Sequence, residues 1–285
     1  MRSEMLSIFM SNLGSVAKTS MSNIIETFYE QYNEDGRMAR REIEFARSKE
    51  IISRYLSGDN MAIADIGGAS GAYSFWLASL GHRVHLLDFT RRHIEQAKAK
   101  AESTGVHLSG YHCADARDLP FDSDFFDMVL LMGPLYHLQL RDDRLKCLRE
   151  SRRILKKGGV VICAIISRYA SMLDGFKYGL IKDENFKSIL KRDIETGCHD
   201  NPHNIEGYFT TAYLHTPDEI KSELEDSGFT DVRLIAVEGF ANMFTAENLP
   251  EDPEVASCML EYIKRTEETY ELLGLSDHIL AIGIK

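Results

Sequence analysis

The stretch that decides the fold is Ala64-Asp65-Ile66-Gly67-Gly68-Ala69-Ser70-Gly71. It follows an apolar run, Met61–Ile66, and precedes a helical pattern that places Ala72, Phe75, Trp76 and Leu80 on one face. Glycine is suited to a sharp strand-to-helix turn whose backbone closely approaches a ligand. The stretch therefore predicts a strand, a turn and a helix, and an ordinary tight turn without a ligand remains an alternative.

Outward from this turn, short apolar runs alternate with longer helical patterns, which indicates βαβ units and a parallel sheet. The sequence predicts an α/β fold with a seven-stranded, mostly parallel, doubly wound sheet. We expect the last strand to enter from the opposite direction. The predicted strands are Met61–Ile66, Val84–Leu87, Val106–Cys113, Phe126–Met132, Val160–Ile166, Val232–Glu238 and His278–Ile284.

One α/β domain accounts for residues 23–285, after a weakly ordered N-terminus over residues 1–22. We divide the domain into N-terminal lid helices, a core, a lid insertion over the carboxyl edge of the sheet, and a C-terminal helix–strand part. The respective ranges are 23–57, 61–166, 168–212 and 216–285. Thr216-Pro217-Asp218-Glu219 has the pattern of a capped helix start with a proline at the first helical position.

Acidic side chains follow the next two predicted strands. Asp88 lies about twenty residues after the glycine-rich turn, a spacing at which a carboxylate can accept hydrogen bonds from both ribose hydroxyls. Phe89 beside it offers a ring to an adenine, and Asp115-Ala116 follows the third strand. Three such loops at neighbouring strand ends predict a nucleoside site at the switch point of an open sheet.

These residues resemble the motifs of the class I, Rossmann-like S-adenosylmethionine (SAM) dependent methyltransferases, of the type that acts on small molecules. Residues 65–71 resemble the first motif, Asp88 the acidic second motif, and residues 113–116 the adenine-contacting turn. Residues 127–130 and 155–159 resemble the fourth strand and the turn into the fifth. The resemblance covers residues 45–240, and it departs from the pattern at Ala69, where the family has a glycine.

The resemblance implies SAM as the cofactor and S-adenosylhomocysteine (SAH) as its product. It implies that Asp65 and the loop residues Gly67, Gly68, Ala69 and Gly71 hold the methionine end. It further implies that Asp88 holds the ribose, and that the adenine lies between Phe89 and Ala116 with Asp115 at its amino group. Met132 and Gly133 are expected near the sulfonium.

The segment Gly133-Pro134-Leu135-Tyr136-His137-Leu138 follows the fourth strand, beside the expected methyl donor. Enzymes that methylate amino groups of nucleic acids typically carry an Asn or Asp at the position of Gly133, and glycine cannot accept such a hydrogen bond. His137 is the candidate catalytic base, because histidine titrates near neutral pH. A purely structural histidine at a helix start is an equal alternative.

Aromatic and histidine side chains are the candidate acceptor contacts. We assign the acceptor site to Tyr32, Tyr136, Tyr208, Tyr213 and His215. Tyr32 lies in a segment that resembles a lid helix, although aromatic residues at helical spacing also fit a core. The spacing of Cys198, His199 and His203 is unusual for zinc, so no metal is predicted.

The composition of the chain narrows the classes of partner that we expect it to bind. With 44% hydrophobic and 27% charged residues, the chain has an ordinary globular composition, and its net charge of −11 opposes nucleic-acid binding. Five scattered cysteines and the lack of a long apolar run predict a cytoplasmic protein that does not enter the membrane. The acceptor atom, oxygen or nitrogen, and the oligomeric state are left open.

Two other functions remain in competition. A nicotinamide-dependent dehydrogenase would use Gly67, Ala69 and Ala72 as its fingerprint and Asp88 for the ribose. Asp65 directly before the turn, the Asp115-Ala116 loop and the terminal strands oppose it. A catalytically silent module that binds SAM or a nucleoside would keep the same acidic ligands without turnover.

Overall fold

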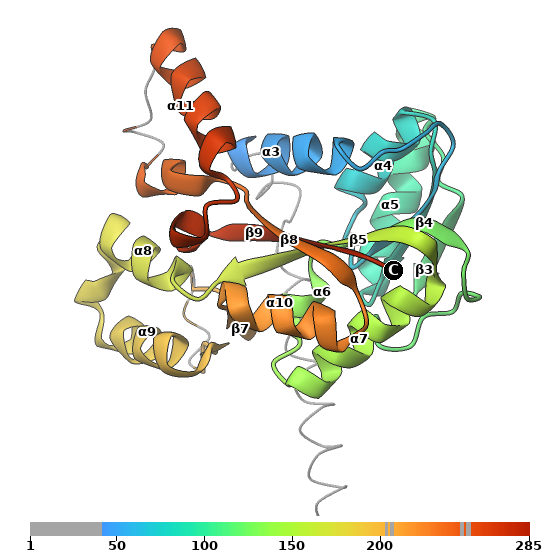
Figure 1. The fold of residues 1–285 in the computed structure, drawn as a ribbon. Coiled ribbons are helices and arrows are strands. Elements are labelled where there is room, and N and C mark those ends of the chain that lie inside the picture. The colour runs from blue at the N-terminus through green and yellow to red at the C-terminus, as the bar shows by residue number, and fades with distance from the viewer. Residues whose placement is uncertain (1–41, 203–204, 206–207, 246–247, 249–251) are drawn as a thin grey trace, which may run out of the picture.

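The computed structural model describes residues 42–202, 205, 208–245, 248 and 252–285. A twisted sheet runs through the middle of the described chain (Figure 1). Its strands are β1 (Ala62–Ile66), β2 (Arg83–Asp88), β3 (Gly110–Cys113), β4 (Phe126–Leu131), β5 (Leu155–Ser167), β6 (Cys198–His199), β7 (Ala212–His215), β8 (Thr230–Ala236) and β9 (His278–Ile284).

The strand order places β1 at the centre of the ligand edge. β1 pairs in parallel with β2 on one side and with β4 on the other, so the chain changes direction across the sheet at this point. Beyond β4 come β5, the antiparallel β9 and then β8. The mostly parallel sheet and the reversed last strand are confirmed, and the ligand crevice of such a sheet lies at the carboxyl end of β1.

Helices cover both faces of the sheet (Figure 1). Side chains alternate between the faces along β1: Ile63 enters the apolar core beneath one helical layer, and Ala64 and Ile66 enter the other. The first layer contains α3 (Glu42–Ser53), α4 (Ala72–Ser79) and α5 (Arg91–Thr104), and the second contains α6 (Pro134–His137), α7 (Arg141–Ile154) and α10 (Pro217–Asp226). None of the helices in the described ranges combines the length and the hydrophobicity that a bilayer crossing requires.

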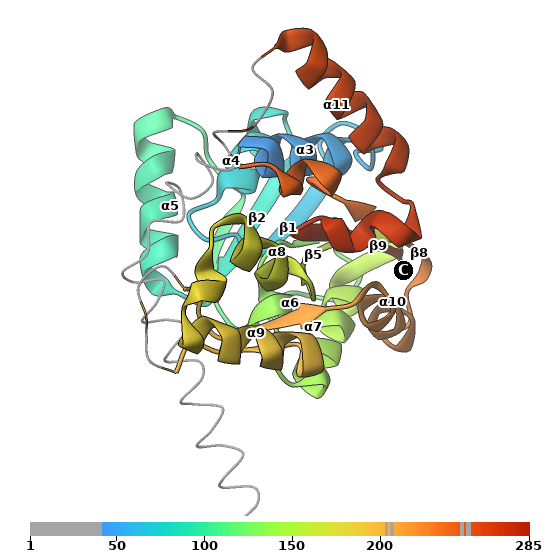
Figure 2. The same ribbon diagram turned by 90° about the vertical axis from the view of Figure 1, so that its left-hand side faces the viewer.

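The insertion after β5 is more ordered than the sequence indicates. It forms α8 (Ala170–Lys177), a 3-10 turn at Leu180–Lys182, α9 (Glu184–Thr196), β6 and β7. Figure 2 looks onto the carboxyl ends of the strands, and α8 and α9 lie in front of them. The predicted count of seven strands is corrected, because β6 and β7 are too short and too polar to give an apolar run.

β7 extends the sheet directly above the end of β4. Ile166 of β5 pairs with Leu214 of β7 and also with His278 of β9, so β7 and β9 lie on opposite edges of β5. The edge that β7 takes is the one that β4 occupies up to Leu131. The β6–β7 hairpin therefore lies beside α6, at the acceptor side that the sequence predicts.

Element boundaries differ from the predictions at three places. The third strand begins at Gly110 rather than Val106, and the fifth includes the Lys157–Gly159 segment that was expected to be a turn. The C-terminal helical region divides into a 3-10 turn at Gly239–Met243, α11 (Pro253–Thr266) and a second 3-10 turn at Tyr270–Leu275. The capping box at Thr216 and Glu219 is confirmed at the start of α10.

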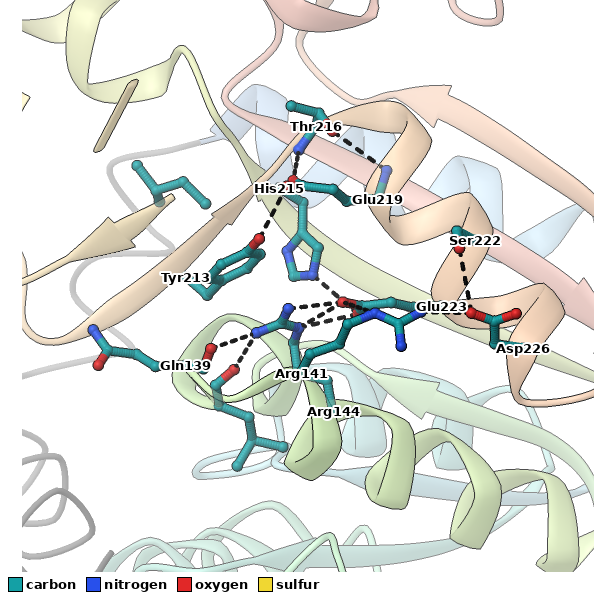
Figure 3. Close-up of polar contacts among 12 residues, drawn as sticks. Gln139, Arg141, Arg144, Tyr213, His215, Thr216, Glu219, Ser222, Glu223 and Asp226 are labelled. Atoms are coloured by element: carbon teal, nitrogen blue, oxygen red, sulfur yellow. Dashed lines mark hydrogen bonds and ion pairs between the residues drawn. The ribbon is translucent and has the colours of Figure 1, made fainter. Parts of the chain in front are cut away.

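A buried polar cluster fixes β7 to α7 and α10 (Figure 3). Arg144 donates to both oxygens of Glu223 at 2.7–3.0 Å and to the carbonyls of Leu138 and Gln139 at 2.7–2.8 Å. His215 Nε2 lies 3.3 Å from Glu223. Burial alone would raise the pKa of Glu223, but the hydrogen bonds from His215 and Arg144 outweigh it and hold this pKa below its usual range.

Removal of one partner of this pair leaves an unpaired buried charge. Both side chains are 2% exposed. We expect Arg144→Met to lower the free energy of unfolding by about 3–5 kcal/mol, and the double variant Arg144→Met/Glu223→Met to recover part of that loss. Urea unfolding at neutral pH measures both values. A loss below about 1 kcal/mol in the single variant would contradict the assigned role of the pair.

Candidate active site

The glycine-rich turn leaves β1 and packs against the segment that follows β4. Gly67 adopts a φ of 69°, and a Cβ at this position would lie 2.6 Å from Cγ of Pro134. Gly133 carries no side chain, and a Cβ there would lie 3.3 Å from the Gly67 carbonyl oxygen. The two segments therefore approach each other through bare backbone, as a site that presents backbone groups to a ligand requires.

Asp88, at the end of β2, holds the turn in place. Its Oδ2 accepts from the Ala69 N–H at 2.9 Å, and its Oδ1 accepts from the Thr90 N–H at 2.8 Å and from His93 Nδ1 at 3.0 Å. Ala69 itself has a φ of 49°, the left-handed conformation that the family glycine adopts without strain. The methyl group of Ala69 is accommodated, and the hydrogen bond to Asp88 stabilises this conformation.

Asp65 lies beneath the turn and not in the crevice. Its side chain is fully buried and accepts from Ser74 Oγ at 2.6 Å, and a Cβ on Gly68 would lie 2.5 Å from its Oδ2. Burial raises the pKa of Asp65 to about 6, and the nearby Asp88 adds to this rise. Oδ2 thus supports the turn from below, whereas Oδ1 is buried without a hydrogen-bond partner. The contact of Asp65 with the methionine end of SAM stays a prediction.

The expected adenine side is formed by the ends of β2 and β3, which pair in parallel at Asp88 and Cys113. Phe89 is 42% exposed, and its carbonyl accepts from Cys113 Sγ at 3.4 Å. Asp115 accepts two-pronged hydrogen bonds from Arg117 at 2.6–3.1 Å. Burial would raise the pKa of Asp115, but the hydrogen bonds from Arg117 outweigh it and lower this pKa.

Ala116, Met132 and Gly133 are the remaining residues that are expected to contact SAM. Ala116 is half-buried and packs against the core on the α7 face, so only part of it faces outward. Met132 and Gly133 follow β4 directly, and the Met132 carbonyl accepts from the Tyr136 hydroxyl at 3.1 Å. Loops from β1, β2, β3 and β4 thus meet at one edge of the sheet.

His137 ends the short helix α6 and contacts the insertion. Its Nδ1 lies 3.4 Å from the Thr211 carbonyl oxygen, and its ring packs on Tyr136 at 4.7 Å. Phe209 stacks on His137 with centroids 6.0 Å apart and lies 6.4 Å from Tyr136. Tyr136, His137 and Phe209 form an aromatic wall that begins at the donor loops, and we use this name for the three residues below.

The other predicted acceptor residues lie in different surroundings. Tyr208 donates to Asp183 at 2.7 Å and packs on Phe186, within the insertion that contains α8 and α9. Tyr213 donates to Glu219 at 3.0 Å and its ring lies 3.6 Å from the Arg144 guanidinium, and His215 is fully buried beside Glu223 (Figure 3). Tyr213 and His215 thus belong to the buried polar cluster, which corrects their assignment to the acceptor site. Tyr32 lies outside the described residues.

A second histidine, His199, contacts Phe209 of the aromatic wall, with ring centroids 6.2 Å apart. His199 of β6 is 4% exposed, and its Nδ1 lies 2.8 Å from Oδ2 of the fully buried Asp193 on α9. The sequence signal was a histidine six residues after an acid. That spacing spans a helix end and a strand start, so only the tertiary structure brings the two together.

One group in the described chain has the spacing of metal ligands: Glu44, Glu238 and His278. These three residues form an ion-paired link between α3 and the ends of β8 and β9, in which His278 lies between Glu44 and Glu238. Glu238 accepts from His278 Nδ1 at 2.7 Å and from Ser276 Oγ at 2.7 Å. Burial would raise the pKa of Glu238, but the charge of His278 and these hydrogen bonds lower it to about 2.

Comparison with known proteins shows which proteins have a similar sequence and fold. A methyltransferase-domain family matches residues 64–163, which contain the turn, Asp88, Asp115 and the segment after β4. Over these residues the chain is similar in sequence to a methyltransferase domain. The domain resembles a ubiquinone biosynthesis O-methyltransferase of Cereibacter sphaeroides, which is 32% identical over 181 residues, 64% of this chain and 65% of the relative. The chain thus spans about two thirds of the length of that relative.

Two further matches are also methyltransferases. A sarcosine/dimethylglycine N-methyltransferase of Halorhodospira halochloris is 31% identical over 137 residues, 46% of this chain and 47% of the relative. A solved SAM-dependent methyltransferase from Thermotoga maritima superposes with a TM-score of 0.57 at 19% identity, over 92% of this chain and 99% of that one. This likeness shows the class I fold of the methyltransferase domain and its surroundings.

The pKa of Asp65 predicts how stability depends on pH. Because the folded-state pKa of about 6 exceeds the ordinary 3.8, the native state binds the proton more tightly, and the buried charge destabilises the fold above pH 6. We expect Asp65→Asn to raise the free energy of unfolding at pH 7 by about 1–3 kcal/mol. The gain should shrink as the pH falls towards 4, in urea unfolding curves. A gain that is the same at every pH would contradict this account.

Proposed function

We propose that the protein is a SAM-dependent methyltransferase that transfers a methyl group to an oxygen or nitrogen atom of a small molecule. The observation that carries this proposal is the convergence of four strand-end loops around Asp88, within a methyltransferase domain. The named relatives act in ubiquinone biosynthesis and on sarcosine or dimethylglycine, which supports a small acceptor. We assign cofactor binding to Asp65, Gly67, Gly68, Ala69, Gly71, Asp88, Phe89, Asp115, Ala116, Met132 and Gly133.

These residues fit SAM in chemistry and in shape. Asp88 offers carboxylate oxygens for a ribose, and the exposed Phe89 offers a ring face for the adenine. When bound, SAM supplies a methyl group on a positively charged sulfur. The protein contributes mainly by holding the acceptor atom in line, because orientation of a bimolecular displacement can supply several kcal/mol.

The acceptor side lies along the aromatic wall and beneath α8 and α9. His137 Nδ1 lies 3.4 Å from the Thr211 carbonyl oxygen, and we propose His137 as the base that accepts a proton from the acceptor. Gly133 lacks the amide or carboxylate that nucleic-acid amino methylation uses, so we propose a small molecule and no nucleic acid or membrane as partner. Free cysteines throughout the chain agree with a cytoplasmic protein.

The rival functions differ in what they predict. A dehydrogenase requires a nicotinamide dinucleotide, whereas residues 64–163 match a methyltransferase domain. A silent SAM-binding module predicts tight binding without transfer to any acceptor. Methyl transfer from radiolabelled SAM to members of a panel of phenols, catechols, hydroxy acids and small amines separates this module from the proposed enzyme.

The cofactor assignment is tested by calorimetric titration with SAM and SAH. We expect micromolar binding, and at least tenfold weaker binding by Asp88→Ala, because the variant loses both the ribose contact and the anchor of the Ala69 N–H. Tenfold corresponds to about 1.4 kcal/mol. Asp122→Asn, an exposed carboxylate in the same domain, is the control and should bind as the wild type does. Failure of the folded wild type to bind either ligand would remove the proposal.

His137→Ala tests the catalytic side separately from the donor side. We expect turnover to fall about 100-fold while the dissociation constant for SAH changes less than threefold, because the imidazole lies on the aromatic wall and outside the donor loops. Initial rates of methyl transfer and calorimetry on the same preparation give both values. Near-normal turnover would show that His137 has a structural role only.

A further inference from the structure

The helix α11 projects from the body of the protein and leaves an apolar face uncovered (Figures 1 and 2). Val255 and Tyr262 are 49% and 53% exposed, and the Cys258 side chain between them is also exposed. These three residues lie at positions i, i+3 and i+7, which share one side of an α-helix. We call them the α11 face.

The contacts that hold α11 lie in its C-terminal half. The structure describes all of α11, and Ile263 alone among its residues is buried. A Cβ on Gly239, in the 3-10 turn below the helix, would lie 3.5 Å from Ile263. A helix of 14 residues is marginally stable in water by itself, and burial of an apolar face supplies most of its stability. A partner that covers the α11 face would therefore stabilise the helix.

The charges at the two ends of α11 are complementary to each other. Asp252 caps the N-terminus and Glu254 lies in the first turn, whereas Lys264 and Arg265 lie in the last turn. A second copy of α11 in the antiparallel direction brings each acidic end to a basic end, and its helix dipole also runs in the favourable opposite direction. A parallel pair would place like charges together.

The two basic side chains are accessible to such a partner. Lys264 and Arg265 are 50% and 67% exposed, and each forms an ion pair within its own chain, with Glu50 and Glu261 respectively. Exposed ion pairs contribute little to stability, so they can be exchanged for the carboxylates of a second copy at small cost.

The apolar residues and the charges of α11 have the same centre. The midpoint between Val255 and Tyr262 in the sequence falls directly after Cys258. The midpoint between Asp252 and Arg265 falls at the same point. A twofold axis there pairs Val255 with Tyr262 of the second copy and brings the two Cys258 side chains close together.

We propose that α11 is a self-association surface, at which two copies of this chain pair in the antiparallel direction about a twofold axis beside Cys258. An isologous contact of this kind closes after two copies, so the assembly is a dimer. A single pair of helices forms a small interface, so the dissociation constant is expected to be about 1–100 µM. The α11 face is separate from the donor loops and from the aromatic wall.

Sedimentation equilibrium of the full chain measures the association. We expect a monomer–dimer equilibrium that Tyr262→Ser weakens at least about tenfold, because the variant loses its apolar contact with Val255 of the second copy. Leu80→Ser removes a similarly exposed apolar side chain from the end of α4 and should leave the equilibrium unchanged. Urea unfolding confirms that each variant is folded. Equal association of the wild type and a folded Tyr262→Ser would overturn the proposal.

Charge reversal tests the antiparallel direction. Glu254→Lys alone, and Lys264→Glu/Arg265→Glu alone, each lose the attraction between opposite helix ends and should associate more weakly than the wild type. An equimolar mixture of the two variants should associate more tightly than either one, because the acidic ends of one variant then meet the basic ends of the other. A mixture that is no tighter than its components would overturn the antiparallel pairing.

Crosslinking locates the twofold axis. A short bis-maleimide should join two wild-type chains, and Cys258→Ser should abolish the crosslinked dimer. Cys113→Ser, at the other exposed cysteine, should retain it. A wild type that stays monomeric up to about 200 µM would overturn the proposal. Protection of Cys258 from maleimide in that monomer would then assign the α11 face to another segment of the same chain.

Discussion

The site depends on the Asp88 carboxylate, which binds the glycine-rich turn of β1 to the end of β2. One oxygen accepts from the Ala69 N–H, and the other accepts from Thr90 and His93. Because the turn contains a non-glycine residue in the left-handed conformation, this hydrogen bond fixes a backbone that would otherwise relax. The position of every donor residue follows from that geometry, since the segment after β4 packs directly on Gly67.

Buried charged pairs fix the position of the elements that surround the expected acceptor site. Arg144 and Glu223 hold β7 against α7 and α10, and Asp193 and His199 join α9 to β6. Such pairs impose one arrangement on a short hairpin that has little apolar surface of its own, because a misplaced partner would leave a charge unpaired in the core. The segment between β6 and β7 then places Phe209 against the rings of both His137 and His199.

The sequence predicted the donor half far better than the acceptor half. The fold of residues 61–166 is predictable because their strands are apolar and long enough to recognise, and because glycines and acidic residues follow them at fixed spacing. The burial of Asp65 beneath the turn could not be predicted, because the motif does not reveal which side of the turn a carboxylate occupies. β6 and β7 were missed because two- and four-residue strands carry no periodic signal, and Tyr213 and His215 were consequently assigned to an open site. Tertiary contacts alone bring Asp193 to His199.

A crystal structure of the protein with SAH tests the central claim most directly. The account predicts ribose hydroxyls within hydrogen-bonding distance of Asp88, the adenine against Phe89, and the sulfur beside Gly133 with the aromatic wall beyond it. SAH bound elsewhere, or bound here with its sulfur turned away from His137, would contradict the account.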